Sequence, residues 1–161
     1  MKVIGFIGSS RKNGATANMV KNLAVSLDSS GKADVLFLSE QKIHYCVGCE
    51  YCRTHEGCSQ KDDMESLLKK MYLSDAIIIG TPVYFGEMSS LAKTFTDRLY
   101  PAYRGKGVSH LRGKKLYLVY SQHSSPEVYA DVRACETSYL YKFLGFEIVT
   151  VFVNGSEVEH T

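Results

Sequence analysis

Four of the five cysteines lie close together, and their spacing is the strongest indication of chemistry in this sequence. They follow the pattern Cys-x2-Cys-x2-Cys-x5-Cys and are Cys46, Cys49, Cys52 and Cys58. Three thiols at two-residue spacing and a fourth nearby can surround a [4Fe–4S] cubane, because one short loop reaches three of its corners. A zinc site usually takes two separated cysteine pairs. The spacing therefore favours a cubane over a zinc ion, and four idle thiols are the third alternative.

A second run of residues, from Gly8 to Thr16, could bind a phosphate group. Small residues let backbone N–H groups converge, and the helix expected to start behind them adds a partial positive charge. Ser9 and Thr16 supply hydroxyl donors, and Arg11 supplies a planar donor pair suited to phosphate oxygens. The run lacks both the Walker ending and the dinucleotide-binding glycine pattern. The alternative is a tight turn with a solvated Arg-Lys pair.

Two further runs could hold a planar ring. The run Gly80–Gly86 follows a predicted strand, and Tyr84 and Phe85 in it offer flat apolar faces. The alternative is a turn whose aromatic side chains pack into the core. The run Ser121–Ser125 follows another predicted strand, and we expect His123 within it to be an ordinary surface histidine. Ligands of open parallel sheets bind at the carboxyl ends of strands, where both runs are expected to lie.

Hydrophobic periodicity predicts the elements that would position these runs. Five apolar runs are predicted to be buried strands: Val3–Gly8, Ala33–Ser39, Asp75–Gly80, Lys115–Ser121 and Phe146–Val153. The segments between them include four with helical spacing. Alternation of this kind predicts an α/β fold in which helices cover both faces of a doubly wound, five-stranded parallel sheet with strand order 2-1-3-4-5. Only a short, mainly polar segment follows the last strand, so the helix that would cover that edge is expected to be missing.

The predicted helices have recognisable boundaries. The first carries an apolar stripe over residues 19–27, and Gly31 is expected to be its C-terminal cap. Asp62 and Glu65 are expected to form a capping box at the start of the second. A third covers residues 91–99.

A fourth helix is expected to start at Ser125, with Pro126 in its first turn, and to end at Gly145. Cys135 is expected to pack in the apolar stripe of this helix. The segment 41–61 has neither period, and it contains the four clustered cysteines.

Length and composition limit the classes of protein. The chain has 161 residues, 45% hydrophobic and 22% charged, so we expect one domain over residues 1–161 with a cysteine-rich insertion at about 41–61. No apolar run approaches the ~20 residues that span a bilayer. A formal charge of +2 gives no reason to expect nucleic acid or a membrane as partner. Because no signal-peptide core is visible, we expect a cytoplasmic protein whose cysteines form no disulfides.

The phosphate run and the ring run together resemble the FMN site of the flavodoxin-like NAD(P)H-dependent FMN reductases. The resemblance lies in Gly-Ser-x-Arg-x-x-Gly-x-Thr and Thr-Pro-Val-Tyr-Phe and extends over nearly the whole chain. It implies that the FMN phosphate is held by Ser9, Arg11, Asn13, Ala15 and Thr16. It implies that the isoalloxazine ring packs on Pro82, Val83, Tyr84, Phe85 and Gly86, with Ser121 at the third loop. Ala15 stands where that family usually has asparagine.

With the cysteine motif added, the chain resembles the iron–sulfur flavoproteins. The match includes Asp62-Asp63-Met64 after the fourth cysteine, and Lys93 and Asp97-Arg98 further along. The resemblance implies an oxidoreductase that passes electrons between FMN and a [4Fe–4S] cluster, with a donor such as NAD(P)H or ferredoxin, and that assembles as a homodimer or homotetramer. No catalytic acid or nucleophile is expected, because FMN and the cluster carry the chemistry. The alternatives are a flavin or quinone reductase without a cluster, and a zinc-stapled interaction module.

Overall fold

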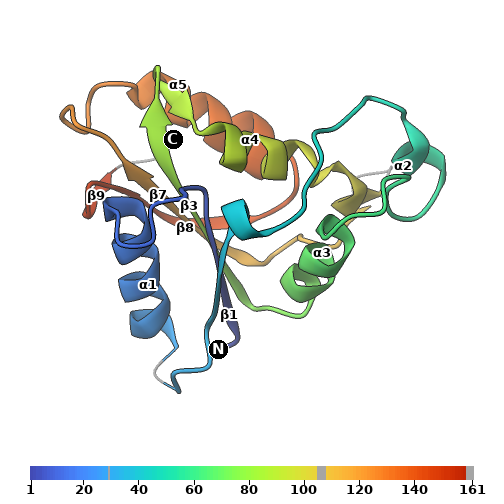
Figure 1. The fold of residues 1–161 in the computed structure, drawn as a ribbon, viewed down its shortest axis with the longest axis horizontal. Helices are drawn as coiled ribbons and strands as arrows, with labels where there is room; N and C mark the ends of the chain where they lie inside the picture. Colours follow the sequence, from blue (N-terminus) through green and yellow to red (C-terminus); the bar gives the residue numbers. More distant parts are fainter. Residues whose placement is uncertain (29, 105–107, 159–161) are drawn as a thin grey trace.

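A mostly parallel sheet forms the centre of the computed structural model, which describes residues 1–28, 30–104 and 108–158 (Figure 1). Its parallel strands are β1 (Val3–Ile7), β2 (Asp34–Phe37), β3 (Ala76–Tyr84), β7 (Lys115–Ser121) and β8 (Glu147–Val153). They lie in the order β2-β1-β3-β7-β8, which is the predicted doubly wound order. Two short antiparallel strands, β4 (Glu87–Met88) on β3 and β9 (Ser156–Val158) on β8, make the sheet seven-stranded rather than five-stranded.

The sheet is covered on both faces, as its nearly continuous apolar strands indicate. Ile78 of β3 belongs to a core that also contains α1 (Ala15–Leu27), whereas Ile77 and Ile79 belong to the opposite core. The opposite core contains α3 (Met64–Tyr72) and α4 (Ser90–Asp97). Among the described residues, α1 supplies all the helical side chains of its core. The described residues that follow β8 form a turn and β9, and residues 159–161 lie outside the described part.

Two glycines allow α1 to pack closely on the sheet. A Cβ atom on Gly80 would lie 2.3 Å from Cγ2 of Val20, and one on Gly5 would lie 3.0 Å from Cγ1 of the same side chain. Val20 is completely buried between them. Because Gly5 and Gly80 carry no side chain, α1 can lie close to β1 and β3.

Two predicted helix boundaries are wrong. Asp28, not Gly31, is the C-terminal cap of α1, although Gly31 adopts the left-handed conformation at φ +70° and its N–H donates to the Asp28 carbonyl. No capping box forms at α3, where Asp63 is the N-cap residue and makes no side-chain cap. Asp62 accepts from the N–H of Met64 over 3.1 Å and also binds a distant arginine, but Glu65 pairs with Lys69 and so does not complete the box.

The fourth helix starts later than predicted. It forms α5 (Ala130–Cys135) and continues as a π-helical segment, η3 (Glu136–Tyr141), before Gly145 turns the chain at φ +82°. Its buried side chains are Arg133, Thr137 and Tyr141, spaced four residues apart. Cys135 lies between two of these positions and is exposed, so its predicted place in the core is wrong.

The cysteine-containing segment follows β2 and a 3₁₀ turn, η1 (Leu38–Glu40), and projects from one end of the sheet, where Figure 1 labels α2. Apart from the short helix α2 (Tyr51–Thr54), residues 41–61 form loop, as predicted. Gly48 and Gly57 have positive φ angles of 64° and 79°, which turn the chain sharply. The segment packs beside a second short region that contains η2 (Tyr100–Ala102), β5 (Tyr103–Arg104) and β6 (Val108–Ser109). None of the described helices is long and apolar enough to cross a bilayer.

Candidate functional site

Three loops meet at the carboxyl edge of the sheet, as the sequence predicts. The N–H of Gly8 donates to the carbonyl of Gly80 over 2.7 Å, which joins the first loop to the second. Ser89, the N-cap residue of α4, donates from its Oγ to the carbonyl of Gly8 over 2.6 Å. The hydroxyls of Thr16 and Ser121 lie 2.6 Å apart and join the first loop to the third. The three candidate loops therefore form one hydrogen-bonded unit.

The first loop divides into buried and exposed side chains. Ser9 and Thr16 are buried, and Ser9 Oγ accepts a hydrogen bond from the backbone N–H of Arg11. The side chains of Arg11, Asn13 and Ala15 are exposed. No side chain caps the start of α1 at Gly14, so the N–H groups of the first helical turn face the loop without a side-chain acceptor. This arrangement can receive an anion.

The second loop is the end of a strand and a tight hairpin, not the longer loop that the sequence suggests. Strand β3 continues through Tyr84, because β7 pairs as far as Pro82 and β4 pairs with Val83 and Tyr84. Phe85 and Gly86 then form a two-residue turn at φ angles of 51° and 87°.

The aromatic side chains of this hairpin do not pack into the core. Tyr84 is 54% exposed and Phe85 is fully exposed, whereas Pro82 is buried and Val83 is half-buried. A positive φ is uncommon for phenylalanine and often marks a functional position. The turn therefore presents two free aromatic faces beside the first loop.

The third loop, after β7, is held by residues that sequence patterns did not reveal. Buried Arg133 donates to the side-chain oxygen of Gln122 over 3.1 Å and to the carbonyl of Val128 over 3.0 Å. The ring of Tyr129 lies against Gly86, where an added Cβ would be 3.2 Å from it. His123 is exposed, as expected. Arg133 lies outside the apolar stripe from which this helix was predicted, so the sequence pattern gave no signal for it.

A separate cavity of about 250 Å³ contains the cysteine motif. Its lining residues include all four motif cysteines, together with residues at the end of α4 and in η2. Cys52 and Cys58 are partly buried, and Cys46 and Cys49 are exposed. Cys49 Sγ lies 3.1 Å from the hydroxyl of Ser59. The four cysteines therefore line one cavity, and their role as ligands of one metal group stays a prediction.

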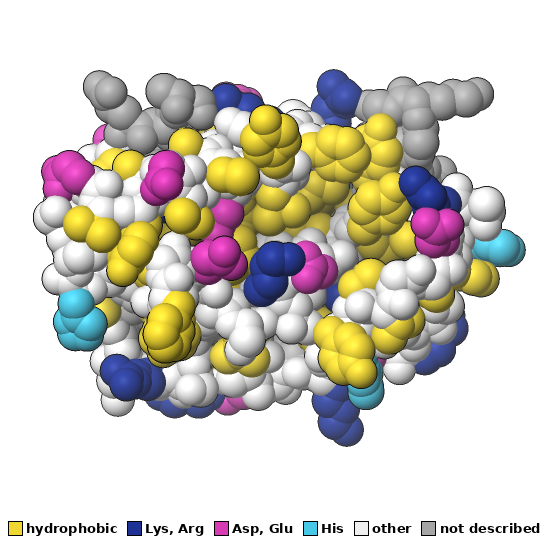
Figure 2. All heavy atoms as spheres, turned by 90° about the horizontal axis from the view of Figure 1, so that it is seen from above, with side chains coloured by type: hydrophobic (Ala, Val, Ile, Leu, Met, Phe, Trp, Pro, Cys, Tyr) yellow, Lys and Arg dark blue, Asp and Glu magenta, His cyan; other side chains and the backbone are white. Residues whose placement is uncertain are grey.

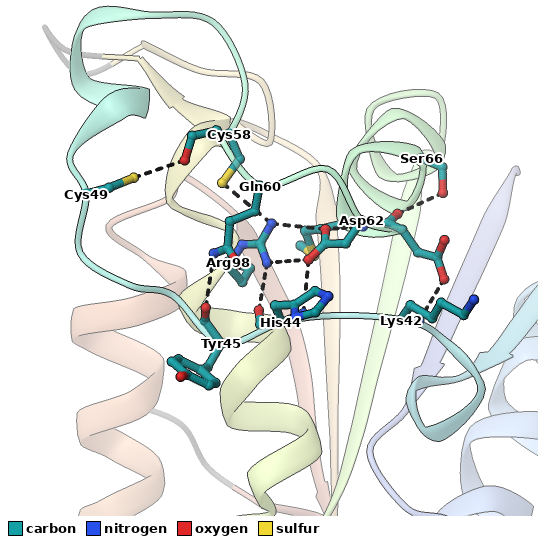
Figure 3. A network of polar contacts seen from close by, with 12 residues as sticks. Lys42, His44, Tyr45, Cys49, Cys58, Gln60, Asp62, Ser66 and Arg98 are labelled. Carbon is teal, nitrogen blue, oxygen red and sulfur yellow. Dashed lines mark hydrogen bonds and ion pairs between the residues drawn. The ribbon is translucent and has the colours of Figure 1, made fainter.

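Arg98 connects α4 to both ends of the cysteine segment (Figure 3). Its guanidinium donates to the carbonyl of His44 over 2.7 Å, to both carboxylate oxygens of Asp62, at 2.7 and 3.1 Å, and to Cys58 Sγ over 3.5 Å. The side chains of Arg98 and Asp62 are each only 1% exposed. The sequence contains Asp97-Arg98, but nothing in its spacing indicated that Arg98 reaches this site.

Burial and these contacts shift the pKa values of two ionisable side chains at this site. Burial raises the pKa of Asp62, but hydrogen bonds from Arg98 and from the N–H groups of His44 and Met64 outweigh it, so the pKa lies below its ordinary value. Burial raises the pKa of Cys52, and the nearness of three other cysteine side chains adds to this shift.

The thiols do not form a closed metal site. Within residues 1–28, 30–104 and 108–158, no three histidine, cysteine, aspartate or glutamate side chains are grouped so that they could hold a metal ion.

This sequence matches one family model and several individual proteins. The sequence model described as NADPH-dependent FMN reductase matches residues 1–134. An iron-sulfur flavoprotein of Archaeoglobus fulgidus is 38% identical over 102 residues, which are 63% of this chain and 46% of that relative. An iron-sulfur flavoprotein of Methanocaldococcus jannaschii is 38% identical over 117 residues, which are 71% of this chain and 58% of that relative. The chain thus spans about half the length of the curated relatives that it matches.

Solved structures with the same fold are more distant in sequence. An NAD(P)H:quinone oxidoreductase from Methanothermobacter marburgensis superposes with a TM-score of 0.76 at 15% identity, covering 95% of this chain and 85% of that structure. A protein from Streptococcus mutans superposes with a TM-score of 0.74 at 18% identity, covering 96% and 88%. At these identities the likeness concerns the fold, which is flavodoxin-like.

Proposed function

The chain belongs to the family of NADPH-dependent FMN reductases, and on that premise we propose that it is an oxidoreductase that passes electrons between FMN and a [4Fe–4S] cluster. NADH or NADPH is the proposed electron donor, and ferredoxin is the alternative. The main observation that supports the proposed cluster is that all four motif cysteines line one cavity. The relatives named iron-sulfur flavoproteins support it.

The residues of the three joined loops fit FMN. The exposed guanidinium of Arg11 and the first-turn N–H groups of α1 suit a doubly charged phosphate, because both carry positive charge toward the same loop. The exposed rings of Tyr84 and Phe85 suit a planar ring system. The residues proposed to contact FMN are Ser9, Arg11, Asn13, Ala15, Thr16, Pro82, Val83, Tyr84, Phe85, Gly86 and Ser121.

The cysteine cavity fits a cluster in its donor chemistry. Thiolates are the usual ligands of iron in a cubane, and the four proposed ligands are Cys46, Cys49, Cys52 and Cys58. A buried cation, Arg98, lies against one of them. Its Nε is buried and has no hydrogen-bond partner among the described residues.

In this proposal the chain positions the two groups and needs no acid or nucleophile of its own. FMN exchanges electrons singly or in pairs, and a cubane exchanges one, so together they join two-electron donors to one-electron acceptors. The hydrogen bonds among the three loops hold the flavin-contacting residues in fixed places. The clamp of Arg98 on His44 and Asp62 holds the two ends of the cysteine segment.

We also propose that the protein forms a homodimer or homotetramer in the cytoplasm, with residues 1–161 as one flavodoxin-like domain. Figure 2 shows the face that carries α4, α5 and η3, where hydrophobic side chains gather around a hollow. Tyr139, Phe143 and Tyr100 are 80%, 50% and 37% exposed. Apolar surface of this kind is often covered by a second subunit.

Anaerobic purification of a matched pair of variants tests the function. We expect wild-type protein to contain FMN, iron and sulfide. Cys49→Ser should keep the flavin absorbance and lose most of the broad iron–sulfur absorbance, because one thiolate ligand is missing while the flavin loops are unchanged. Cys135→Ser is the control, since Cys135 is exposed and does not line the cavity. It should retain both.

Three other outcomes would contradict the proposal in different ways. Reconstituted wild-type protein that holds FMN but no iron, and that NAD(P)H reduces as fast as Cys49→Ser, would be a plain flavin or quinone reductase. Colourless protein with one zinc ion per chain would be an interaction module stapled by zinc. Equal loss of iron in Cys49→Ser and Cys135→Ser would show that the iron is not bound specifically by the four motif cysteines.

A further inference from the structure

Arg98 is the one buried cation in contact with a motif cysteine among the described residues. Its Nη2 donates to Cys58 Sγ over 3.5 Å, which is within hydrogen-bonding range for sulfur. Its side chain is 1% exposed, so solvent screens its charge far less than that of a surface arginine. Figure 3 shows the guanidinium between Cys58 on one side and Asp62 and His44 on the other.

Most charges that line the cysteine cavity are already paired with one another or with neighbours. Glu50 pairs with Arg53 over 2.8 Å, and Asp97 pairs with Lys93. Both of these pairs are more than 40% exposed, so water weakens their fields. Arg98 differs because it is buried.

The ion pair with Asp62 does not use all the donors of Arg98. Asp62 takes one donor from each Nη, and the remaining contacts go to His44 and Cys58. Nε stays buried without an acceptor. A buried guanidinium donor without an acceptor is costly unless an acceptor is present in the working protein. The contact that links Arg98 to the cysteine motif is the hydrogen bond from Nη2 to Cys58 Sγ.

We infer that Arg98 is a positioning residue that hydrogen-bonds the Cys58 sulfur and thereby raises the reduction potential of the cluster, an inference that rests on the function proposed above. Reduction adds one negative charge to a group already rich in thiolates. A buried cation at hydrogen-bond distance stabilises the reduced state more than the oxidised state, and hydrogen bonds to the sulfurs and local charge are known determinants of cluster potentials. Arg98 would therefore favour transfer of an electron from FMN to the cluster.

A purely structural role for Arg98 makes a different prediction. Arg98 holds the segments on both sides of the cysteine motif, at His44 and Asp62, and this clamp alone would account for its burial. A structural role predicts lower stability or lower cluster content on substitution, but an unchanged potential in the molecules that retain the cluster. The potential is therefore the measurement that separates the two roles.

The test is an anaerobic redox titration of the reconstituted protein that follows cluster and flavin together. In Arg98→Gln we expect the equilibrium constant for cluster reduction to fall at least tenfold relative to wild type, which is 59 mV for a one-electron couple. Arg98→Lys keeps the charge that Asp62 requires but lacks the planar donor pair, so we expect a smaller fall, about threefold. The FMN potential, measured in the same titration, should stay unchanged in both variants.

Arg53→Gln is the matched control, because it removes the same charge from the same cavity at an exposed, paired position. We expect it to change the equilibrium constant less than about twofold. If Arg98→Gln leaves an unpaired Asp62 that prevents folding or cluster uptake, judged by FMN content and iron, the value for Arg98→Lys decides.

The remaining outcomes each count against the inference. Unchanged cluster potentials in both Arg98 variants would leave only the structural role, and so would failure of both to take up iron while Arg53→Gln does. Equal shifts in Arg98→Gln and Arg53→Gln would show a general charge effect. Wild-type protein without a cluster would overturn both the proposed function and this inference. If wild-type protein contains a cluster whose potential does not change when Arg98 is substituted, only the inference is overturned.

Discussion

Exposure separates the side chains of the 9–16 loop into two groups with different roles. The buried hydroxyls of Ser9 and Thr16 bind other parts of the protein, the first to the backbone of its own loop and the second to Ser121. The exposed side chain of Arg11 remains available for a ligand. At the scale of single residues, Arg11 is therefore the position where the phosphate proposal is most directly tested.

Arg11→Ala should weaken FMN binding by about ten- to a hundredfold, because it removes a charge-assisted phosphate contact of roughly 1.5–3 kcal/mol. Lys12→Ala is the control, since Lys12 pairs with Glu40 and lies over the ring of Phe37 rather than facing the loop. Fluorescence titration of the FMN-free proteins measures both affinities. Equal affinity in Arg11→Ala and wild type would place the phosphate elsewhere.

At the scale of elements, the site depends on how closely α1 approaches the sheet. The missing Cβ of Gly80 allows that approach, because a Cβ there would lie 2.3 Å from Val20 Cγ2. The carbonyl of Gly80 also accepts the hydrogen bond from Gly8 that joins the first two loops. Any movement of α1 away from β3 would therefore alter the candidate phosphate loop as well as the core.

Gly80→Ala should destabilise the protein by about 1–3 kcal/mol, the usual cost of overpacking a core. The added Cβ would lie 2.3 Å from Val20 Cγ2, so Val20 or α1 must shift. In a Val20→Ala background the same substitution should cost less, because the clashing methyl group is absent. Urea unfolding of the four proteins forms a double-mutant cycle. A coupling energy near zero would show that the clash does not determine the effect.

At the scale of the whole molecule, the face seen in Figure 2 carries hydrophobic side chains around a hollow. A hollow of about 470 Å³ lies between α4 and the α5–η3 segment, and Tyr139 and Leu140 line it together with charged residues. The rings of Tyr103 and Phe143 pack against each other at an interplanar angle of 32°, with centroids 4.5 Å apart. A second copy of the chain is the partner that we propose for this face.

Tyr139→Glu should shift the protein toward monomer, because it places a charge in the apolar centre of the proposed contact. Val25→Glu is the control, since Val25 is 67% exposed on α1, which covers the other side of the sheet. Light scattering at micromolar concentration, before and after each change, gives the mass. A monomer mass for wild-type protein would contradict the proposed oligomer, and equal dissociation by both substitutions would place the contact elsewhere.

Much of this molecule follows from the order of residues along the chain. Buried parallel strands require continuous apolar runs, so β1, β3 and β7 were predictable within a few residues, and their order followed from the handedness of crossovers. The meeting of three loops at one sheet edge followed from that topology. The spacing of the cysteines is by itself enough to place four thiols in one short segment.

What the tertiary structure alone decided is which distant side chains complete these sites. Arg98 reaches Asp62 and Cys58, 36 and 40 residues away, and Thr16 reaches Ser121, 105 residues away. In the fourth helix, Arg133 rather than Cys135 lies on the buried face and donates to Gln122 in the third loop. Hydrophobic periodicity indicates only which side chains of one helix or strand face the core. A single long-range hydrogen bond leaves no periodic pattern, so these contacts appear only when the sheet brings the segments together.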